Sequence, residues 1–435
     1  MAGNTRRGFV RAATTAVAGL GAVAAGPRET LAIDGGPKAV TLPAGRIDAI
    51  TKWPRYGPEE KQAVLDLLES NKFYQEIPLL ENELRDYLKV SYVKAHCNGT
   101  SALMSMFFAL DLPPGSEILV PSYTAWATVA PMQFFGYVPV FVDINPRTAC
   151  FDLEDAARRL TPRARAMVVM HSWGLPCDMD EIGAFARRHG LIVAEDAAQA
   201  VGASLEGKPM GTWGAMGVFS FQTSKTLAAV EGGAGMYHSR EHYERAVTFG
   251  NYDLPGKFPD DSPYRRYAGT GMGPKLRIHP LAAALARVQL RGMDRRNVVV
   301  DAQVRKLAGR LVELPGLSRQ HCRPDAKRVY WASQILFLDK SKTGAGKDAL
   351  VKALQAEGVR IQHCVYEEQH KYALYSEAKW WHHPPEIPRD LPGTTQVNRT
   401  AVRLPLFYEE APELLEQYAK AFEKVWAHRS QLGRS

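Results

Sequence analysis

The sequence predicts an α/β fold with a mostly parallel central sheet flanked by helices, followed by a smaller C-terminal α+β unit. From about residue 58, helical and strand-like segments alternate along the chain, which is typical of parallel sheets with helical crossovers. This alternation stops beyond a long helical pattern that starts at residue 280. A chain of 435 residues is also too long for one small core, so more than one domain is expected.

The periodicity of apolar residues assigns the segments in order. Helical spacing marks residues 59–70, 102–110 and 179–190. Short apolar runs predict strands at 117–122, 137–144, 166–171 and 191–196. The helix at 179–190 ends on a glycine, the residue that helix C-caps favour. Later in the chain, a helix is expected near 346–358 and an amphipathic helix at the C-terminal end.

Composition and charge narrow the class of protein. Hydrophobic residues make up 46% and charged residues 23%, as in ordinary globular proteins, and no window approaches the roughly eighteen apolar residues of a membrane span. The net charge is +8, but lysines and arginines alternate with acids, so nucleic-acid binding is not indicated. The five scattered cysteines lack CxxC spacing, so no disulfide framework is predicted.

The first 24 residues differ from the rest of the chain. Arg6-Arg7 and Phe9 precede a mildly apolar stretch that ends in Ala22-Val23-Ala24, a pattern typical of a cleavable twin-arginine export signal. Its removal would take away three arginines and no acid, and would leave a net charge of +5. We therefore expect export to the periplasm. The alternative is an alanine-rich extension without a function, which would leave the protein in the cytoplasm.

The expected division of the chain follows from these patterns. Residues 1–24 form the signal, residues 25–290 the N-terminal segment and large domain, and residues 291–435 the small C-terminal domain. The long helix that starts at residue 280 joins the two domains.

A candidate anion site lies at the start of the apolar helix near residue 102. Thr100 and Ser101 follow a glycine and would offer hydroxyls and backbone N–H groups at the helix N-terminus. Ser220, at the end of a later strand, adds a hydroxyl that can reach a phosphate. A plain helix cap explains Thr100 and Ser101 equally well when they are taken alone.

Two charged residues follow predicted strands and point to cofactor chemistry. Asp196 ends a strand in "IVAED", where it could hold a pyridinium nitrogen and so tune pyridoxal phosphate. Lys225 lies in the apolar and hydroxyl-rich "FSFQTSKTLAAV", and apolar surroundings depress a lysine pKa and prepare the amine for Schiff-base formation. Taken singly, Asp196 could be a helix cap or an ion-pair member, and Lys225 a surface residue of a hairpin.

Two other patterns fail as binding motifs. "TGAGKD" at 343–348 resembles a phosphate loop, but its flanking Ser341 and its Asp348 stand where glycine and a Ser or Thr are needed. The C-terminal histidines and Cys364 fit no standard metal spacing, so no metal is predicted.

Several motifs together resemble the DegT/StrS family of pyridoxal-phosphate-dependent sugar and cyclitol aminotransferases, which have fold type I. They are "NGT", "PSYT", "AEDAAQA", "FSFQTSK", "EGGAG" and "KLRIHPLAAALA", in this order along the chain. The resemblance runs from "LAIDGGP" at residue 31 to "RLPLF" at residue 403, and parts of it are similar to inosose and aminohydroxybenzoate-type enzymes.

The resemblance implies a role for each candidate residue. Lys225 would form the Schiff base with pyridoxal phosphate, Asp196 would pair with its pyridine nitrogen, and Gln199 would lie near its phenolic oxygen. Thr100, Ser101 and Ser220 would hold the phosphate. Lys275 would reach the phosphate of a neighbouring subunit, which makes the expected active unit a homodimer with shared active sites.

The sequence departs from the family where a ring should stack on the cofactor. Ala125 occupies that position, so we expect either that Trp126 or Tyr123 replaces the missing ring or that the cofactor ring is held less firmly. Tyr123 and His370 are the expected substrate contacts. The lysine at position 275, where the family usually has asparagine, is a second departure.

The expected reaction moves an amino group from L-glutamate or L-glutamine to a keto-sugar or keto-cyclitol. Two alternatives use the same residues: another pyridoxal-phosphate reaction, of the dehydratase or racemase kind, and a cofactor-binding regulatory protein without turnover. Histidine replaces the lysine in dehydratases of the family, so Lys225 argues against dehydration.

Overall fold

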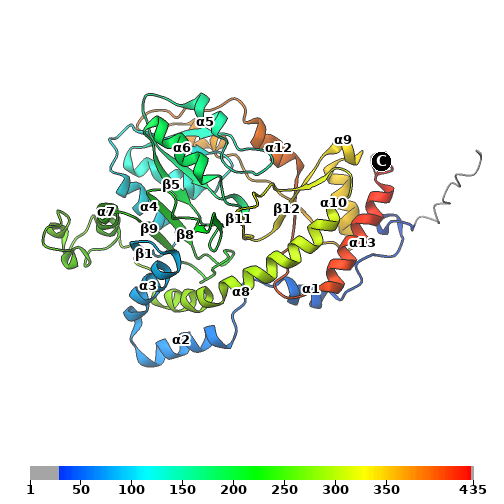
Figure 1. Ribbon diagram of the computed structural model, residues 1–435, viewed down its shortest axis with the longest axis horizontal. Coiled ribbons are helices and arrows are strands. Elements are labelled where there is room, and N and C mark those ends of the chain that lie inside the picture. The colour runs from blue at the N-terminus through cyan, green and yellow to red at the C-terminus, as the bar shows by residue number, and fades with distance from the viewer. Residues whose placement is uncertain (1–28, 433–435) are drawn as a thin grey trace, which may run out of the picture.

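A computed structural model describes residues 29–432 of the chain. Its main feature is a seven-stranded sheet in the order β1-β9-β8-β5-β4-β2-β3 (Figure 1). The strands are β1 (Tyr92–His96), β2 (Glu117–Pro121), β3 (Val138–Val142), β4 (Ala164–Met170), β5 (Ile192–Asp196), β8 (Met216–Ser220) and β9 (Gly233–Tyr237). Strands β3, β2, β4, β5 and β8 pair in parallel, and β9 pairs antiparallel with both β8 and β1. The predicted mostly parallel sheet is confirmed.

Helices cover both faces of this sheet, because alternate residues of each strand point to opposite sides. In β2, Leu119 packs into a core shared with helices α3, α6 and α8, whereas Ile118 and Val120 face a second core that includes α4. The helices of this large part are α2 (Pro58–Ser70), α3 (Glu76–Leu88), α4 (Gly99–Leu110), α5 (Leu153–Arg159), α6 (Met179–His189), α7 (Arg240–Gly250) and α8 (Pro280–Leu311). Helix α6 ends at Gly190 in the left-handed conformation, with φ 65°, as its sequence predicts.

A smaller antiparallel sheet, in the order β10-β12-β14-β13, forms the second part. Its strands are β10 (Leu317–Arg319), β12 (Gln334–Leu338), β13 (Gln362–His363) and β14 (Ala401–Leu404). The accompanying helices are α1 (Ala44–Thr51), α9 (Lys340–Thr343), α10 (Lys347–Ala356), α12 (Pro392–Thr400) and α13 (Pro412–His428). The short helix α11 (Ala373–Ser376) packs instead on the large sheet, through Tyr375. Three short strands, β6 (Ser204–Leu205), β7 (Lys208–Pro209) and β11 (Ala326–Lys327), form a third sheet.

Short 3-10 turns complete the described chain. They are η1 (Ala32–Asp34), η2 (Phe73–Gln75), η3 (Trp126–Thr128), η4 (Ala130–Phe135), η5 (Ser172–Gly174), η6 (Pro255–Lys257), η7 (Arg265–Tyr267) and η8 (Gln369–Lys371). Turns η6 and η7 belong to a lobe that projects beside α7 (Figure 1).

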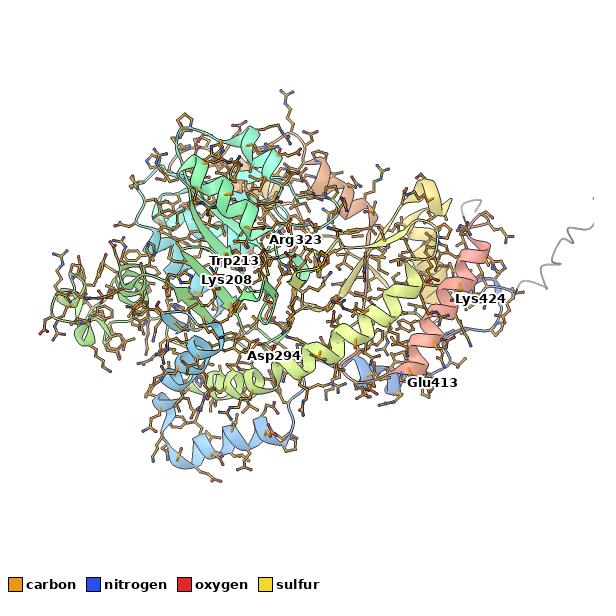
Figure 2. All side chains as sticks on the ribbon, in the orientation of Figure 1. Lys208, Trp213, Asp294, Arg323, Glu413 and Lys424 are labelled. Atoms are coloured by element: carbon orange, nitrogen blue, oxygen red, sulfur yellow. The ribbon has the colours of Figure 1, made fainter. Side chains whose placement is uncertain are left out.

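Helix α8 runs along both parts of the molecule (Figure 1). Its N-terminal half packs into the large core through Ala283 and Ala286, and its C-terminal half packs into the smaller core through Leu307 and Leu311. Asp294, between these halves, accepts hydrogen bonds from Tyr87 of α3 at 3.1 Å and Lys327 of β11 at 3.2 Å (Figure 2). The boundary expected between residues 290 and 291 therefore falls inside a continuous helix.

The segment before α2 differs from the sequence-based division. Leu31, Val40, Ile47 and Ile50 are buried in the smaller core together with α10 and α13. The sequence-based division places this segment with the large domain, whereas its apolar side chains pack on the C-terminal unit.

Within residues 29–432, no helix has both the length and the apolar character needed to cross a bilayer. Residues 1–24, the expected export signal, lie outside the described part of the chain.

Candidate active site

Lys225 lies in a tight turn after β8, at the edge of the sheet where the parallel strands end. Its backbone N–H donates to the carbonyl of Gln222 at 2.8 Å, and its own carbonyl accepts from Trp53 Nε1 at 3.1 Å. Burial lowers the pKa of Lys225 from 10.5 to about 8, and the carboxylate of Asp196 opposes this shift. A large fraction of the amine is therefore neutral near pH 8, the form that attacks an aldehyde.

Asp196 lies at the same edge because β5 and β8 are neighbouring parallel strands. The side chain is 4% exposed. One carboxylate oxygen accepts from the hydroxyl of Thr128 at 2.6 Å, and the other accepts from the N–H of Ala198 at 3.0 Å. These two bonds fix the orientation of a buried carboxylate that the charge of Lys225 also faces.

The N-terminus of α4 and the end of β8 form a cradle for an anion. Asn98 caps the helix by accepting from the N–H of Ser101 at 2.8 Å. A Cβ atom added to Gly99 would lie 2.7 Å from Cβ of Ser220, so only glycine lets the two segments approach this closely. Thr100, Ser101 and Ser220 are thereby brought together at a helix N-terminus, the arrangement that favours a phosphate.

Gln199 lies in the turn after β5, where hydrogen bonds hold its side chain, including a weak one to Met170 Sδ at 3.7 Å. Its side-chain oxygen accepts from the N–H of Trp173 at 2.8 Å, and its side-chain nitrogen donates to the hydroxyl of Tyr366 at 3.1 Å. The side chain is 2% exposed, so its orientation is set by these partners.

Aromatic residues from both parts of the molecule surround Lys225. The ring of Trp331 lies 4.3 Å from the Lys225 Nζ atom and stacks on Trp173 at 4.9 Å. Tyr366 contacts Trp173 edge-on at 5.6 Å, and burial raises the pKa of its hydroxyl, which is therefore neutral. Sequence reasoning missed Trp331, Trp173, Tyr366 and Thr128 because they lie in turns and loops that carry no recognisable spacing.

The two residues expected to replace the missing stacking ring lie in different environments. Tyr123 is fully buried, accepts a hydrogen bond from Trp173 Nε1 at 3.2 Å and packs against Tyr366 at 5.0 Å. Trp126 is 60% exposed in η3. Tyr123 thus belongs to the aromatic cluster around the site, whereas Trp126 lies at the molecular surface.

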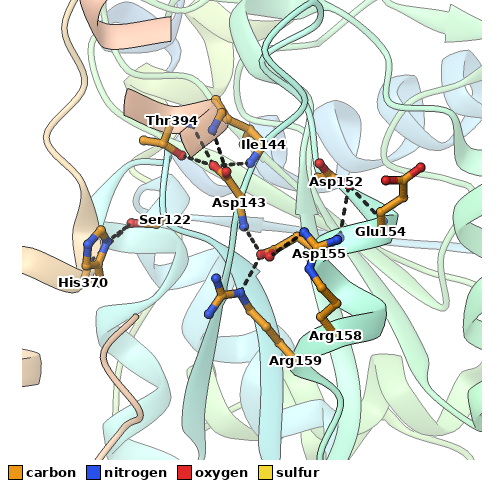
Figure 3. Close-up of polar contacts among 11 residues, drawn as sticks. Ser122, Asp143, Ile144, Asp152, Glu154, Asp155, Arg158, Arg159, His370 and Thr394 are labelled. Atoms are coloured by element: carbon orange, nitrogen blue, oxygen red, sulfur yellow. Dashed lines mark hydrogen bonds and ion pairs between the residues drawn. The ribbon is translucent and has the colours of Figure 1, made fainter. Parts of the chain in front are cut away.

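His370 is not grouped with Lys225. It lies in η8 on the β2–β3 side of the sheet, 3% exposed, with Nδ1 at 2.7 Å from the hydroxyl of Ser122 (Figure 3). Strands β4 and β5 separate β2 from β8, which carries Lys225 at its end. Burial lowers the pKa of His370, so the ring is neutral and acts as a hydrogen-bonding partner of Ser122.

Lys275 is exposed in the segment before α8. Within the described residues its side chain makes no hydrogen bond or ion pair. The neighbouring carbonyl of Leu276 accepts from the N–H of Cys97 at 2.8 Å, which ties this segment to the turn before α4. Among residues 29–432, no group of three or more His, Cys, Asp and Glu side chains is arranged to hold a metal ion.

The fold and the site define a class of protein, the pyridoxal-phosphate enzymes of fold type I. The phosphate cradle, the oriented carboxylate and the lysine with a depressed pKa fit the three anchoring points of this cofactor. Residues 54–423 match the DegT/DnrJ/EryC1/StrS aminotransferase family, and the chain belongs to this family. It is a pyridoxal-phosphate-dependent aminotransferase, and transamination is favoured over the dehydratase, racemase and regulatory alternatives.

Relatives act on activated sugars and on cyclitols. The chain is 31% identical to GDP-perosamine synthase of Caulobacter vibrioides over 70% of this chain and 81% of the relative. It is 32% identical to L-glutamine:2-deoxy-scyllo-inosose aminotransferase of Streptoalloteichus tenebrarius over 80% of this chain and 84% of the relative.

Solved structures share the fold over nearly their whole length. An aminotransferase from Psychrobacter cryohalolentis superposes with a TM-score of 0.79 at 24% identity, covering 87% of this chain and 99% of that one. DesI, solved in the presence of its TDP-sugar product, has a TM-score of 0.74 at 26% identity, covering 92% of this chain and 96% of its own.

Proposed function

We propose that this aminotransferase moves the amino group of L-glutamate or L-glutamine to the ketone of a sugar or cyclitol. The observation that carries the proposal is the Lys225 amine, which burial brings to a pKa of about 8 beside a carboxylate fixed by Thr128. A relative named for L-glutamine and an inosose, and another named for a GDP-linked amino sugar, support the donor and acceptor classes.

Each residue has a defined task in this proposal. When bound, pyridoxal phosphate supplies an electron sink for the charge that develops at the donor α-carbon. Lys225 Nζ would take the proton from that carbon and deliver it to the cofactor carbon that receives the amino group, and a pKa near the working pH suits both steps. Asp196 keeps a proton on the ring nitrogen, and the cradle of Thr100, Ser101 and Ser220 holds the phosphate.

The first test is the absorption spectrum of the cofactor-loaded protein before and after addition of L-glutamate or L-glutamine. Loss of the visible band of the loaded enzyme, with formation of the amine form of the cofactor, is expected for a competent donor. Lys225→Ala is the control, because it removes the amine and should abolish turnover. A spectrum that no amino donor changes, or normal multiple turnover by Lys225→Ala, would contradict the proposal.

The acceptor is tested once the donor is known. Enzyme converted to the amine form is mixed with a nucleotide-linked keto-sugar or with a free keto-cyclitol, and return of the visible band reports transfer. If the visible band returns only with the nucleotide-linked compound, the acceptor is a sugar nucleotide. If it returns only with the cyclitol, the acceptor is a cyclitol.

We further propose that the active unit is a homodimer with shared sites. Lys275 is exposed and unbonded within the described chain, as expected for a residue that reaches a partner. Large apolar side chains are also exposed on the large part, among them Trp126 at 60%, Phe134 at 69% and Val230 at 52%. Apolar side chains that are exposed in one contiguous patch are typical of an interface, and these residues are candidates for such a patch.

Complementation tests the shared site directly. Lys225→Ala and Lys275→Ala subunits, each impaired alone, are mixed under conditions that exchange subunits. In a mixed dimer with sites built from both chains, one site carries both changes and the other carries neither, so activity should reappear. Mixtures that stay inactive although subunits exchange would show that Lys275 acts within its own chain, and normal activity of Lys275→Ala alone would show that it has no role.

We also propose that residues 1–24 direct export by the twin-arginine route, on the strength of Arg6-Arg7 and the Ala22-Val23-Ala24 site. This route carries folded proteins, so the cofactor can be loaded before export. Cell fractionation with N-terminal sequencing should find a shortened periplasmic protein, and changing Arg6 and Arg7 to lysine should retain it in the cytoplasm. Full-length protein found only in the cytoplasm would contradict export.

A further inference from the structure

Trp331 lies against the amine of Lys225, although it comes from a distant segment between β11 and β12. The distance from Nζ to the ring centre is 4.3 Å. A cation over the face of a tryptophan ring is attracted by the ring quadrupole, and the attraction is stronger where water is excluded. Trp331 is therefore placed to stabilise the charged form of the amine.

Two contacts hold the ring in this position. Trp331 Nε1 donates to the hydroxyl of Ser224 at 3.2 Å, next to Lys225 in the chain. The second contact is with Trp173, whose ring stacks on that of Trp331 with the ring centres 4.9 Å apart and an interplanar angle of 30°. The ring is thus held by the lysine turn after β8 and by Trp173 in η5, both in the large part of the molecule.

The backbone that presents Trp331 is strained. Ala332 has φ 57°, in the left-handed region that is unfavourable for a residue with a Cβ, and the N–H of Ser333 turns back to the carbonyl of Trp331 at 2.5 Å. Strain of this kind persists only where the surroundings enforce it, and it is concentrated at functional sites. The tight turn therefore supports a role for Trp331 beyond filling space.

Asp196 and Trp331 both favour the charged amine, but Asp196 has a second task under the proposed function. Asp196 at the end of β5 is the charged group that faces the amine, whereas Tyr366 after β13 has its ring centre 6.4 Å from that of Trp331, and its hydroxyl is neutral because burial raises its pKa. If Asp196 engages the ring nitrogen of the cofactor, the face of Trp331, 4.3 Å from the amine, still favours its charge.

We propose that Trp331 is a positioning residue that holds the protonated amine of Lys225 beside the reacting carbon whenever the lysine is not bonded to the cofactor. The inference rests on the proposed function for its place in the reaction, but its first test needs only the cofactor-free protein.

That test measures the pH dependence of Lys225 labelling by acetic anhydride in the cofactor-free protein, read by mass spectrometry of the Lys225 peptide. The wild-type midpoint is expected near pH 8. Trp331→Leu keeps an apolar side chain without a ring face, and should lower the midpoint by about 0.4 to 1.5 pH units. Trp331→Phe keeps a weaker ring face and should lower it less. A midpoint that is unchanged or raised in Trp331→Leu, or equal in the two variants, overturns the proposal.

A second measurement follows the loaded enzyme through one turnover with donor deuterated at the α-carbon. Trp331→Leu should slow the proton-transfer phase about two- to thirty-fold and enlarge its isotope effect, with the donor KM unchanged. An unchanged rate and isotope effect would contradict the positioning role. If the wild-type protein converts no donor, the proposed function fails. If the wild-type protein converts donor, and Trp331→Leu converts it with the same rate and isotope effect, this inference alone fails.

Discussion

Thr128 shows how one unremarkable residue can set the chemistry of the site. It lies in η3, and its hydroxyl donates to the Asp196 carboxylate at 2.6 Å. Thr124 lies 2.8 Å from the same hydroxyl, so the carboxylate ends a short chain of buried hydroxyl groups. Hydrogen bonds to a charged group are stronger than neutral ones, because the charge assists them.

Thr128→Val is expected to lower kcat/KM about ten- to a hundredfold, since a hydrogen bond to a charged group contributes about 1.5–3 kcal/mol. Valine has nearly the same shape, so the fold should be retained. Steady-state kinetics and the affinity for pyridoxal phosphate are the measurements. Thr161→Val is the matched control, because Thr161 bonds Glu117 at the start of β2, the opposite edge of the sheet. Equal losses in both variants would show that Thr128 has no special role.

At the scale of elements, helix α12 is fastened to the end of β3 by Asp143. This carboxylate accepts from the N–H of Gly393 at 2.6 Å and from the N–H and hydroxyl of Thr394, each at 2.7 Å (Figure 3). A Cβ on Gly393 would lie 1.9 Å from the carbonyl oxygen of Ile144, so the helix start is pressed against the backbone after β3. Carboxylates are favourable at helix N-termini.

The same helix supports the active site from a distance. Asn398, within α12, accepts from the N–H of Tyr366 at 2.9 Å and donates to its carbonyl at 2.8 Å. The hydroxyl of Tyr366 in turn accepts a hydrogen bond from the side-chain nitrogen of Gln199. The position of the aromatic cluster therefore depends on the anchoring of α12.

Asp143→Asn should lower the free energy of unfolding by about 2–3 kcal/mol, because an amide nitrogen replaces an acceptor that faces several buried donors. It should also raise the KM for the substrates through the displacement of Tyr366. Denaturant titration and steady-state kinetics test both effects. Asp339→Asn is the control, because Asp339 caps the short, exposed α9 by accepting a hydrogen bond from the N–H of Ser341 at 3.0 Å. Its substitution should lower the free energy of unfolding by about 1 kcal/mol or less. A smaller loss at Asp143 than at Asp339 would refute the anchoring role.

At the scale of the whole molecule, Glu357 ties the N-terminal segment to the C-terminal unit. It is fully buried, and its carboxylate accepts from the N–H groups of Ala32 at 2.8 Å and Ala39 at 2.9 Å. Lys424 of α13 completes the site with an ion pair at 3.0 Å (Figure 2). Removing one member of a buried pair leaves a buried charge without its partner.

Glu357→Gln is accordingly expected to destabilise the protein by about 3–5 kcal/mol and to speed proteolysis between residues 31 and 43. Thermal unfolding and timed digestion with mass spectrometry are the measurements. Glu416→Gln serves as the control, because its pair with Arg310 is exposed on both sides and contributes about 1 kcal/mol or less. If both variants lose the same stability and residues 31–43 resist proteolysis, the segment is held by its apolar contacts instead.

The alternation of helices and strands and the position of Asp196 at the carboxyl end of the sheet were predictable, because they depend on local patterns. Apolar periodicity and the glycine at position 190 specify α6 and its end, and the carboxyl ends of neighbouring parallel strands meet at one edge of a sheet. Residues at such ends come together whatever the connecting loops do.

The placement of Trp331 beside the amine, of Thr128 beneath Asp196 and of residues 31–50 on the smaller core could not be read in advance. These contacts join segments far apart in the chain, and they depend on the direction in which each loop leaves its element. The exposure of Trp126 and the burial of Tyr123, only three residues apart, have the same origin. Local sequence specifies which elements form and which strand ends meet, whereas side-chain burial at the site follows from the packing of the complete chain.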